Sequence, residues 1–133
     1  MRLLYLLLIA LTLPHAPYSP DLARFPLHVG DPAPADCVFY STYDEAPTCF
    51  RQYDSGPVRF ASITAANGRI ATLGLTLSDG ATMGDMIAVL GRPHQERVGR
   101  SYRACWDDAR AWVGGPVHRL ASPVLYVSLG VEC

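Results

Sequence analysis

Four cysteines are the first candidates for chemistry in this sequence: Cys37, Cys49, Cys105 and Cys133. None of them forms a Cys-x-x-Cys pair, so the spacings of thioredoxin-like redox sites and of zinc ribbons are both missing. An even number of cysteines in a short chain with an export signal indicates disulfide bonds instead. Of the three pairings that four cysteines allow, we expect Cys37–Cys49 and Cys105–Cys133, because each joins neighbours in the sequence. In the chain-entropy model each bond would stabilise the fold by roughly 3–4 kcal/mol.

The remaining polar residues do not form a recognisable catalytic or metal-binding pattern. His94, His118, Asp107 and Asp108 are candidate metal ligands, but no His-x-x-x-His or His–carboxylate spacing links them. Asp107 and Asp108 fit a hairpin turn better. No serine lies in a Gly-x-Ser-x-Gly context. We therefore expect no catalytic residues, no metal and no cofactor, and predict that the protein is not an enzyme.

The basic residues form one candidate binding region. All eleven are arginine, and the formal net charge is −1, which argues against a nucleic-acid binder. The segment "RPHQERVGRSYR" is nevertheless locally basic, and one interpretation of it is an anion-contact edge for lipid headgroups or an acidic partner. The residues of this edge are Arg92, His94, Arg97, Arg100 and Arg103. The alternative, which we favour, is a solvated loop and strand whose basic residues happen to be arginine.

Aromatic residues gather before the first predicted hairpin. They are Phe39, Tyr40, Tyr43, Phe50 and Tyr53. Tyrosines and other aromatics commonly anchor protein–protein contacts, so this group predicts a partner surface. The alternative is that these side chains cover one end of a small core. The sequence favours neither interpretation over the other.

The N-terminus indicates the compartment. Arg2 precedes the apolar run Leu3–Leu13, which is too short for a membrane-spanning helix of ~20 residues but suits a secretory signal. Pro14 and Pro17 then end any helix. We expect residues 1–16 to be a signal peptide or a short N-terminal anchor. The protein would be exported, either secreted or attached to the outside of the cytoplasmic membrane through an uncleaved N-terminus.

The proline-rich residues 17–36 predict a linker, either polyproline-like or disordered, ahead of a single domain at residues 37–133. Within that domain, "CVFYSTY" favours a short strand or extended segment and "DEAPT" a turn. The runs "VRFASITA" and "RIATLGLTL" are joined by Asn67-Gly68, which predicts a tight hairpin because both residues accept a positive φ. Alternation in the first run places Val58, Phe60, Ser62 and Thr64 on one face and Arg59, Ala61 and Ile63 on the other.

The segment "GATMGDMIAVLGRP" predicts a helix at about residues 83–90. Thr82 and Asp85 form a capping-box pair at its start. Gly91 supplies a left-handed residue at its end, and Pro93 prevents continuation. The apolar stripe consists of Met83, Met86, Ile87 and Leu90. A phosphate-binding loop is excluded, because the Walker lysine and the Gly-x-Gly-x-x-Gly pattern are both missing.

After the helix, "SYRACW" and "RAWV" predict a second hairpin and "VLYVSLGVE" a last strand. The fold class is therefore α+β: a small antiparallel sheet in the order β-β-α-β-β-β, with one helix on one face, stapled by disulfides.

The helix segment resembles the helix signature of the SmpA/OmlA-type outer-membrane-assembly lipoproteins and the related modules of β-lactamase inhibitor protein. The matching residues are Gly80, Thr82, Met86, Leu90, Gly91 and Pro93, with Cys105-Trp106 in a later strand. The segment is also similar to uncharacterised exported bacterial proteins. Two features depart from the family: there is no lipoprotein cysteine, and a β-hairpin precedes the helix where another helix is usual. The resemblance implies a non-catalytic envelope scaffold for protein contacts.

These observations favour an exported, non-catalytic protein-interaction or envelope-structural module, with another protein of the envelope or exterior as its partner. The first alternative is a secreted inhibitor-like binder of another enzyme. A small hydrolase is the third.

Overall fold

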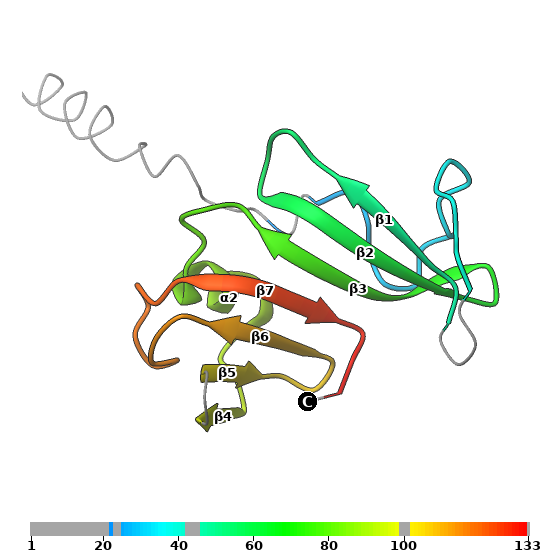
Figure 1. The fold of residues 1–133 in the computed structure, drawn as a ribbon. Helices are drawn as coiled ribbons and strands as arrows, with labels where there is room; N and C mark the ends of the chain where they lie inside the picture. The colour runs from blue at the N-terminus through cyan, green and yellow to red at the C-terminus, as the bar shows by residue number, and fades with distance from the viewer. Residues whose placement is uncertain (1–21, 23–24, 42–45, 99–101, 133) are drawn as a thin grey trace, which may run out of the picture.

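The computed structural model describes residue 22 and residues 25–41, 46–98 and 102–132. Seven strands form one antiparallel sheet in the spatial order β1-β2-β3-β7-β6-β5-β4 (Figure 1). The elements are β1 (Thr48–Gln52), β2 (Val58–Ala66), β3 (Arg69–Leu77), α2 (Met83–Leu90), β4 (Gln95–Val98), β5 (Tyr102–Cys105), β6 (Ala109–Val113) and β7 (Val124–Leu129). The last strand returns to pair with β3 and so joins the two halves of the sheet.

The predicted α+β class, with an antiparallel sheet and one helix among the described residues, is confirmed, but the strand order needs correction. The chain has one more strand before α2 and one more after it than the predicted β-β-α-β-β-β order. The missing strands are β1 and β4, which lie at the two edges of the sheet. In "CVFYSTY", the described residues contribute only a bridge between Tyr40 and Thr48. The sequence "QERV" of β4 lacks apolar alternation, so its strand conformation comes from pairing with β5.

The hairpin at Asn67-Gly68 is confirmed. These two residues have φ angles of 54° and 73°, and β2 pairs with β3 from Ala66 and Arg69 outward. Positive φ at both central residues matches the twist of a two-residue turn to that of the strands that it connects.

Val58 corrects the predicted alternation in β2. It is buried on the same side as Ala61, whereas the sequence pattern grouped it with Phe60. The cause is a register shift: Val58 pairs with Leu77, but Phe60 pairs with Thr76. An extra residue in one strand turns the preceding side chain to the opposite face, so a bulge interrupts the simple two-residue period.

Helix α2 begins and ends where the sequence predicts. The Thr82 side chain accepts a hydrogen bond from the backbone N–H of Asp85, and the Asp85 carboxylate accepts one from the backbone N–H of Thr82. This is the predicted capping box. Gly91 has the expected positive φ of 78°, but its ψ of −173° is extended and not left-handed helical. The chain therefore leaves the helix directly in an extended conformation towards β4.

The helix covers one face of the sheet. Met83 and Met86 are fully buried in the core, together with strand residues such as Leu73 and Val127. At its first turn, the backbone N–H groups of Met83 and Gly84 donate to carbonyls of the loop between β6 and β7. These bonds satisfy donors that a helix leaves unpaired at its N-terminus. The helix is thus held by its cap, by the core and by a neighbouring loop.

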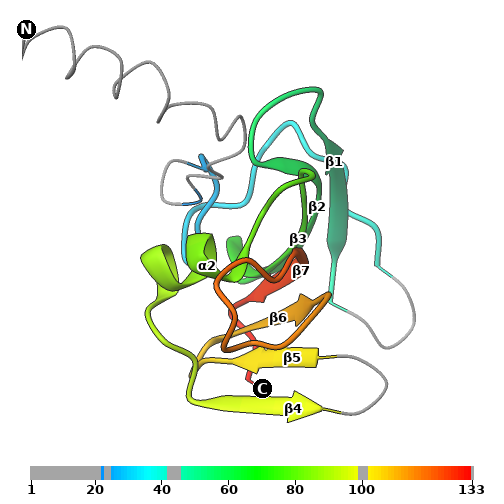
Figure 2. The same cartoon turned by 90° about the vertical axis from the view of Figure 1, so that its left-hand side faces the viewer.

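The described part of the predicted linker packs against the domain. Leu22 and Phe25 are buried in the core, and the Phe25 ring makes an edge-on contact with Tyr53 at 5.5 Å between centroids. Residue 22 and the segment from residue 25 to 36 lie on the same side of the sheet as α2 (Figure 2). Apolar positions between the prolines of this segment thus contribute to the core of the domain.

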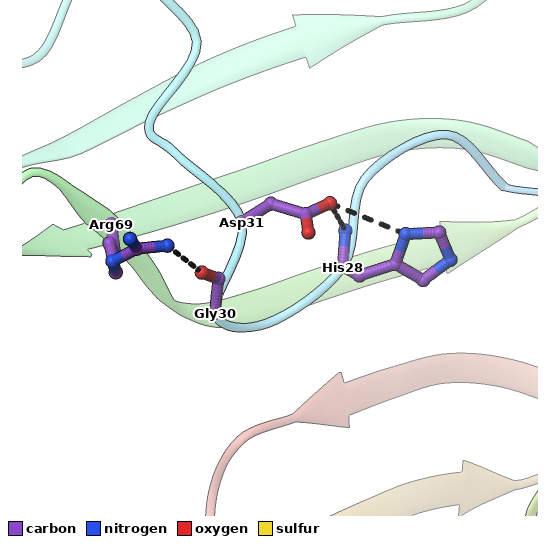
Figure 3. A network of polar contacts seen from close by, with 4 residues as sticks. All are labelled: His28, Gly30, Asp31 and Arg69. Carbon is purple, nitrogen blue, oxygen red and sulfur yellow. Dashed lines mark hydrogen bonds and ion pairs between the residues drawn. The ribbon is translucent and has the colours of Figure 1, made fainter.

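Hydrogen bonds fix this segment to the β2–β3 hairpin (Figure 3). Ile70 donates to the carbonyl of Asp31 and accepts from the N–H of Gly30, both at 2.8 Å. The Arg69 guanidinium donates to the Gly30 carbonyl at 2.9 Å. The Asp31 carboxylate closes the turn by accepting from the His28 backbone N–H. Both the side chains and the backbone therefore hold the segment in place.

The predicted Cys37–Cys49 disulfide is confirmed, with 6.0 Å between the two Cα atoms. It ties the N-terminal segment to β1. Cys105 is also disulfide-bonded. Its predicted partner, Cys133, lies outside the described residues, so that pairing stays a prediction.

Candidate interaction surface

The side of the sheet opposite α2 carries a continuous aromatic and polar surface, which we call the open face. Alternate residues along each strand point to it, and the cross-strand register shows which of them share it. Its described members include Thr48, Phe50, Gln52, Phe60, Ser62, Thr64, Thr72, Gly74, Thr76, Tyr126, Ser128, Arg110, Trp112, Arg103 and Cys105. The intervening residues, such as Leu75 and Ala111, are buried on the core side.

Two phenylalanines stack on the open face. The rings of Phe50 and Phe60 lie 5.7 Å apart between centroids, with 21° between their planes. They remain 56% and 40% exposed, respectively. Tyr40, which bridges to Thr48 at the edge of β1, is 64% exposed. Large exposed aromatics that are close together on a small domain commonly mark contact sites.

The predicted aromatic surface is therefore divided by the fold. Tyr40 and Phe50 belong to the exposed group, whereas Phe39 and Tyr53 pack against the core. Tyr43 lies outside the described residues. Phe60, which the sequence analysis left out, takes part because register places it beside β1. The alternation of side chains in β1 indicates Phe60 as a neighbour of Phe50 only once the pairing of β1 with β2 is known.

A row of side chains crosses the open face from strand to strand. In register order it consists of Phe60, Thr76, Tyr126, Trp112 and Arg103. The guanidinium carbon of Arg103 lies 4.0 Å from the centre of the Trp112 ring, which is a cation–π contact. Tryptophan, tyrosine and arginine are the residue types that most often dominate binding energy at protein interfaces.

Small residues form the neighbouring row and leave room for Tyr126. That row contains Ser62, Gly74 and Ser128. A Cβ atom added to Gly74 would overlap the Tyr126 hydroxyl and lie 2.5 Å from the Ser62 Oγ. The hydroxyl end of the Tyr126 side chain therefore lies against Gly74.

The predicted anion-contact edge is dispersed. Arg92 and His94 are exposed in the loop after α2. The backbone of Arg97 pairs with that of Arg103, and Arg100 lies outside the described residues. Arg103 joins the open face, where it lies near Arg110, a residue that the sequence analysis did not select. The structure thus places the best-defined arginine pair on the sheet and not in the loop.

One contact between candidate metal ligands was not expected from the sequence. His94 Nε2 lies 3.2 Å from the Asp107 carboxylate, and both side chains are largely exposed. Among the described residues, however, no group of three or more histidine, cysteine, aspartate or glutamate side chains is arranged to hold a metal ion. The contact is exposed, and exposed contacts of this kind typically contribute little to stability.

A small cavity lies on the core side, beneath the N-terminal segment. Its volume is about 190 Å³, and its lining is mainly apolar, including Leu22, Phe25 and Leu129. Sites for drug-sized ligands usually have roughly 300–1,000 Å³. The open face, rather than this cavity, is therefore the stronger candidate for binding.

In the described part of the chain, no helix has the length and apolar character needed to cross a membrane. Comparison of the chain with protein-family models, with curated proteins and with solved structures finds no match.

Proposed function

We propose that this protein is an exported, non-catalytic interaction module that binds another protein of the cell envelope or exterior through its open face. The observation that carries the proposal is the exposed stack of Phe50 and Phe60 beside the row that ends at Trp112 and Arg103. Fixing such side chains on a rigid sheet lowers the entropy lost on binding.

The composition of the open face supports binding over catalysis. Its described members include hydroxyl, aromatic and guanidinium groups, but no histidine, aspartate or glutamate. These three residue types are the usual general acids and bases of enzymes. The serines Ser62 and Ser128 therefore have no neighbouring base on this face to activate them.

The export part of the proposal rests on the Cys37–Cys49 disulfide and on the apolar run near the N-terminus. Disulfides persist mainly in oxidising, extracytoplasmic compartments. Intact-mass measurement of natively expressed protein, with and without reduction and alkylation, checks this part. Four alkylatable thiols in the unreduced protein would contradict it.

Site-specific photo-crosslinking in native cells tests the surface. The photoreactive residue p-benzoylphenylalanine replaces Phe60 in one variant and Leu120 in the other. Leu120 is a matched control, since it is 59% exposed but belongs to the loop between β6 and β7. We expect a defined crosslinked protein from position 60 and none from position 120. Equal crosslinking from both positions would reject the open face as the contact surface.

The identity of the crosslinked protein separates the two interaction hypotheses. A structural envelope protein supports the leading proposal, whereas an enzyme whose activity falls on binding supports the inhibitor-like alternative. An absence of any crosslink from position 60 in folded, disulfide-bonded protein would contradict both hypotheses.

A further inference from the structure

Arg103 and Arg110 differ from other arginines of the chain in their surroundings. Arg51 and Arg59 each contact a carboxylate, that of Asp36 and that of Asp79, respectively. No ion pair joins Arg103 or Arg110 to an acid among the described residues. The Nε atoms of both are buried without a hydrogen-bond partner there. Among the described residues, these two partly buried guanidinium groups therefore have no acidic partner.

The sheet places these two arginines as diagonal neighbours. Arg103 pairs with Trp112. Arg110 pairs with Cys105, which is two residues further along the same strand as Arg103. Diagonal neighbours on one face have Cα atoms roughly 7–8 Å apart, within reach of long side chains. Stacking on Trp112 also holds the Arg103 guanidinium close to the sheet and leaves N–H groups at its edge to donate.

The charge of this region opposes that of the whole chain. The formal net charge is −1, but the described open-face residues include these two cations and no anion. Local charge of one sign on a partly desolvated surface favours a partner of the opposite sign. A single arginine guanidinium binds a carboxylate in a planar, two-pronged geometry, and a second arginine nearby adds further donors and positive charge.

We infer that the open face recognises a protein segment in which an aspartate or glutamate lies beside an apolar side chain. The carboxylate of this segment contacts Arg103 and Arg110. The neighbouring apolar side chain packs on Tyr126 and Phe60, which lie in the same cross-strand row as Arg103. This inference depends on the proposed function and specifies the chemistry of the partner.

The observations favour an acidic protein over an anionic membrane. Membrane-binding basic clusters typically contain about 4–8 lysines or arginines, whereas the described arginine side chains on this face are two, those of Arg103 and Arg110. Arginine beside tryptophan and tyrosine is typical of the energetically dominant residues of protein interfaces.

Selection from a random peptide-display library tests the inference. The probe is the purified, disulfide-bonded chain, and the matched variants are Arg103→Gln/Arg110→Gln and Arg59→Gln/Arg119→Gln. Both variants remove two positive charges, but Arg59 lies beside Asp79 and Arg119 lies in the loop before β7. Urea denaturation verifies that each variant is folded.

We expect the enriched peptides to carry aspartate or glutamate next to an apolar residue. Their affinity should fall by at least about tenfold in Arg103→Gln/Arg110→Gln and should change little in the control pair. Binding should also weaken as salt is raised. Enriched peptides without acidic residues, or equal binding to both variants, would overturn the inference.

The same experiment separates this inference from the function on which it rests. Peptides that lose binding to a Phe60→Ser chain but not to Arg103→Gln/Arg110→Gln would refute only the acidic partner. Failure to select any peptide that requires Phe60 would contradict the proposed function as well. Vesicles of phosphatidylcholine with phosphatidylglycerol provide the remaining comparison: binding to them that requires both arginines would overturn the inference in favour of lipid.

Discussion

Gly130 combines a positive φ with close packing around its Cα atom. It follows β7 with a φ of 78°, and its N–H donates to the Asp108 carbonyl at 2.7 Å. A Cβ atom at this position would overlap the Ala71 carbonyl oxygen and lie 3.2 Å from the Val29 side chain. The Ala71 carbonyl belongs to the backbone of β3 and has little freedom to move away.

Replacing Gly130 with alanine should therefore lower the free energy of unfolding by roughly 2–4 kcal/mol, through positive φ and overlap together. The control is Gly91→Ala, since Gly91 also has a φ of 78° but has no atom within 4 Å of the added Cβ. Gly91→Ala should lower the free energy of unfolding by only about 1–2 kcal/mol, from the positive φ angle alone. Urea denaturation of both variants measures the difference, and equal costs would show that the Ala71 contact is unimportant.

At the scale of elements, the contrast between α2 and the edge strands explains what local sequence can predict. The helix is defined by Thr82, Asp85 and Gly91, which lie within one short segment and interact with its own backbone. The edge strand β4 has no such signal, because its conformation depends on hydrogen bonds to β5. Helix ends were therefore predictable residue by residue, whereas β1 and β4 were not.

The capping box leads to a prediction at this scale. Thr82→Ala removes the oxygen that accepts from the Asp85 N–H and should destabilise the protein by about 1 kcal/mol. Thr82→Ser keeps this oxygen and should cost much less. Thermal or urea unfolding of the two variants checks the result. Similar losses for serine and alanine would mean that packing of the threonine methyl group, and not the cap, is responsible.

For the whole molecule, the N-terminal segment and the sheet act as one unit. Residues 25–37 contact the β2–β3 hairpin through backbone hydrogen bonds, contribute Phe25 to the core, and end at the disulfide to β1. The disulfide closes a loop with a sequence separation of 12. A short covalent loop thus reinforces a segment whose prolines give it few backbone donors.

Removing this bond in the variant Cys37→Ala/Cys49→Ala should destabilise the protein by about 3 kcal/mol. The N-terminal segment should open more readily, so amide hydrogen exchange should accelerate at Gly30 and Ile70, which form its hydrogen bonds to β3. Exchange at Leu75, in the centre of the sheet, provides the internal comparison. Unchanged protection at Gly30 and Ile70 relative to Leu75 would show that hydrogen bonds and packing hold the segment without the disulfide.

The candidate surface was only partly predictable from the sequence, because its composition depends on which strands pair. Tyr40, Phe50 and Arg103 were selected from the sequence, but as members of two separate groups. Their common face depends on the pairing of strands, which also brings in Trp112 and Tyr126. No local spacing connects residues that lie tens of positions apart, so the composition of a sheet face follows from register alone.

The sequence by itself determined the features that arise from neighbouring residues: α2 and its caps, the Asn67-Gly68 turn and the antiparallel α+β class. Only the tertiary structure decided the seven-strand order, the inward position of Val58 and the packing of Leu22 and Phe25 against the core. The physical reason is the range of the interactions. A capping bond or a tight turn is encoded within a few residues, whereas strand register, bulges and core completion depend on distant segments that meet only when the chain folds.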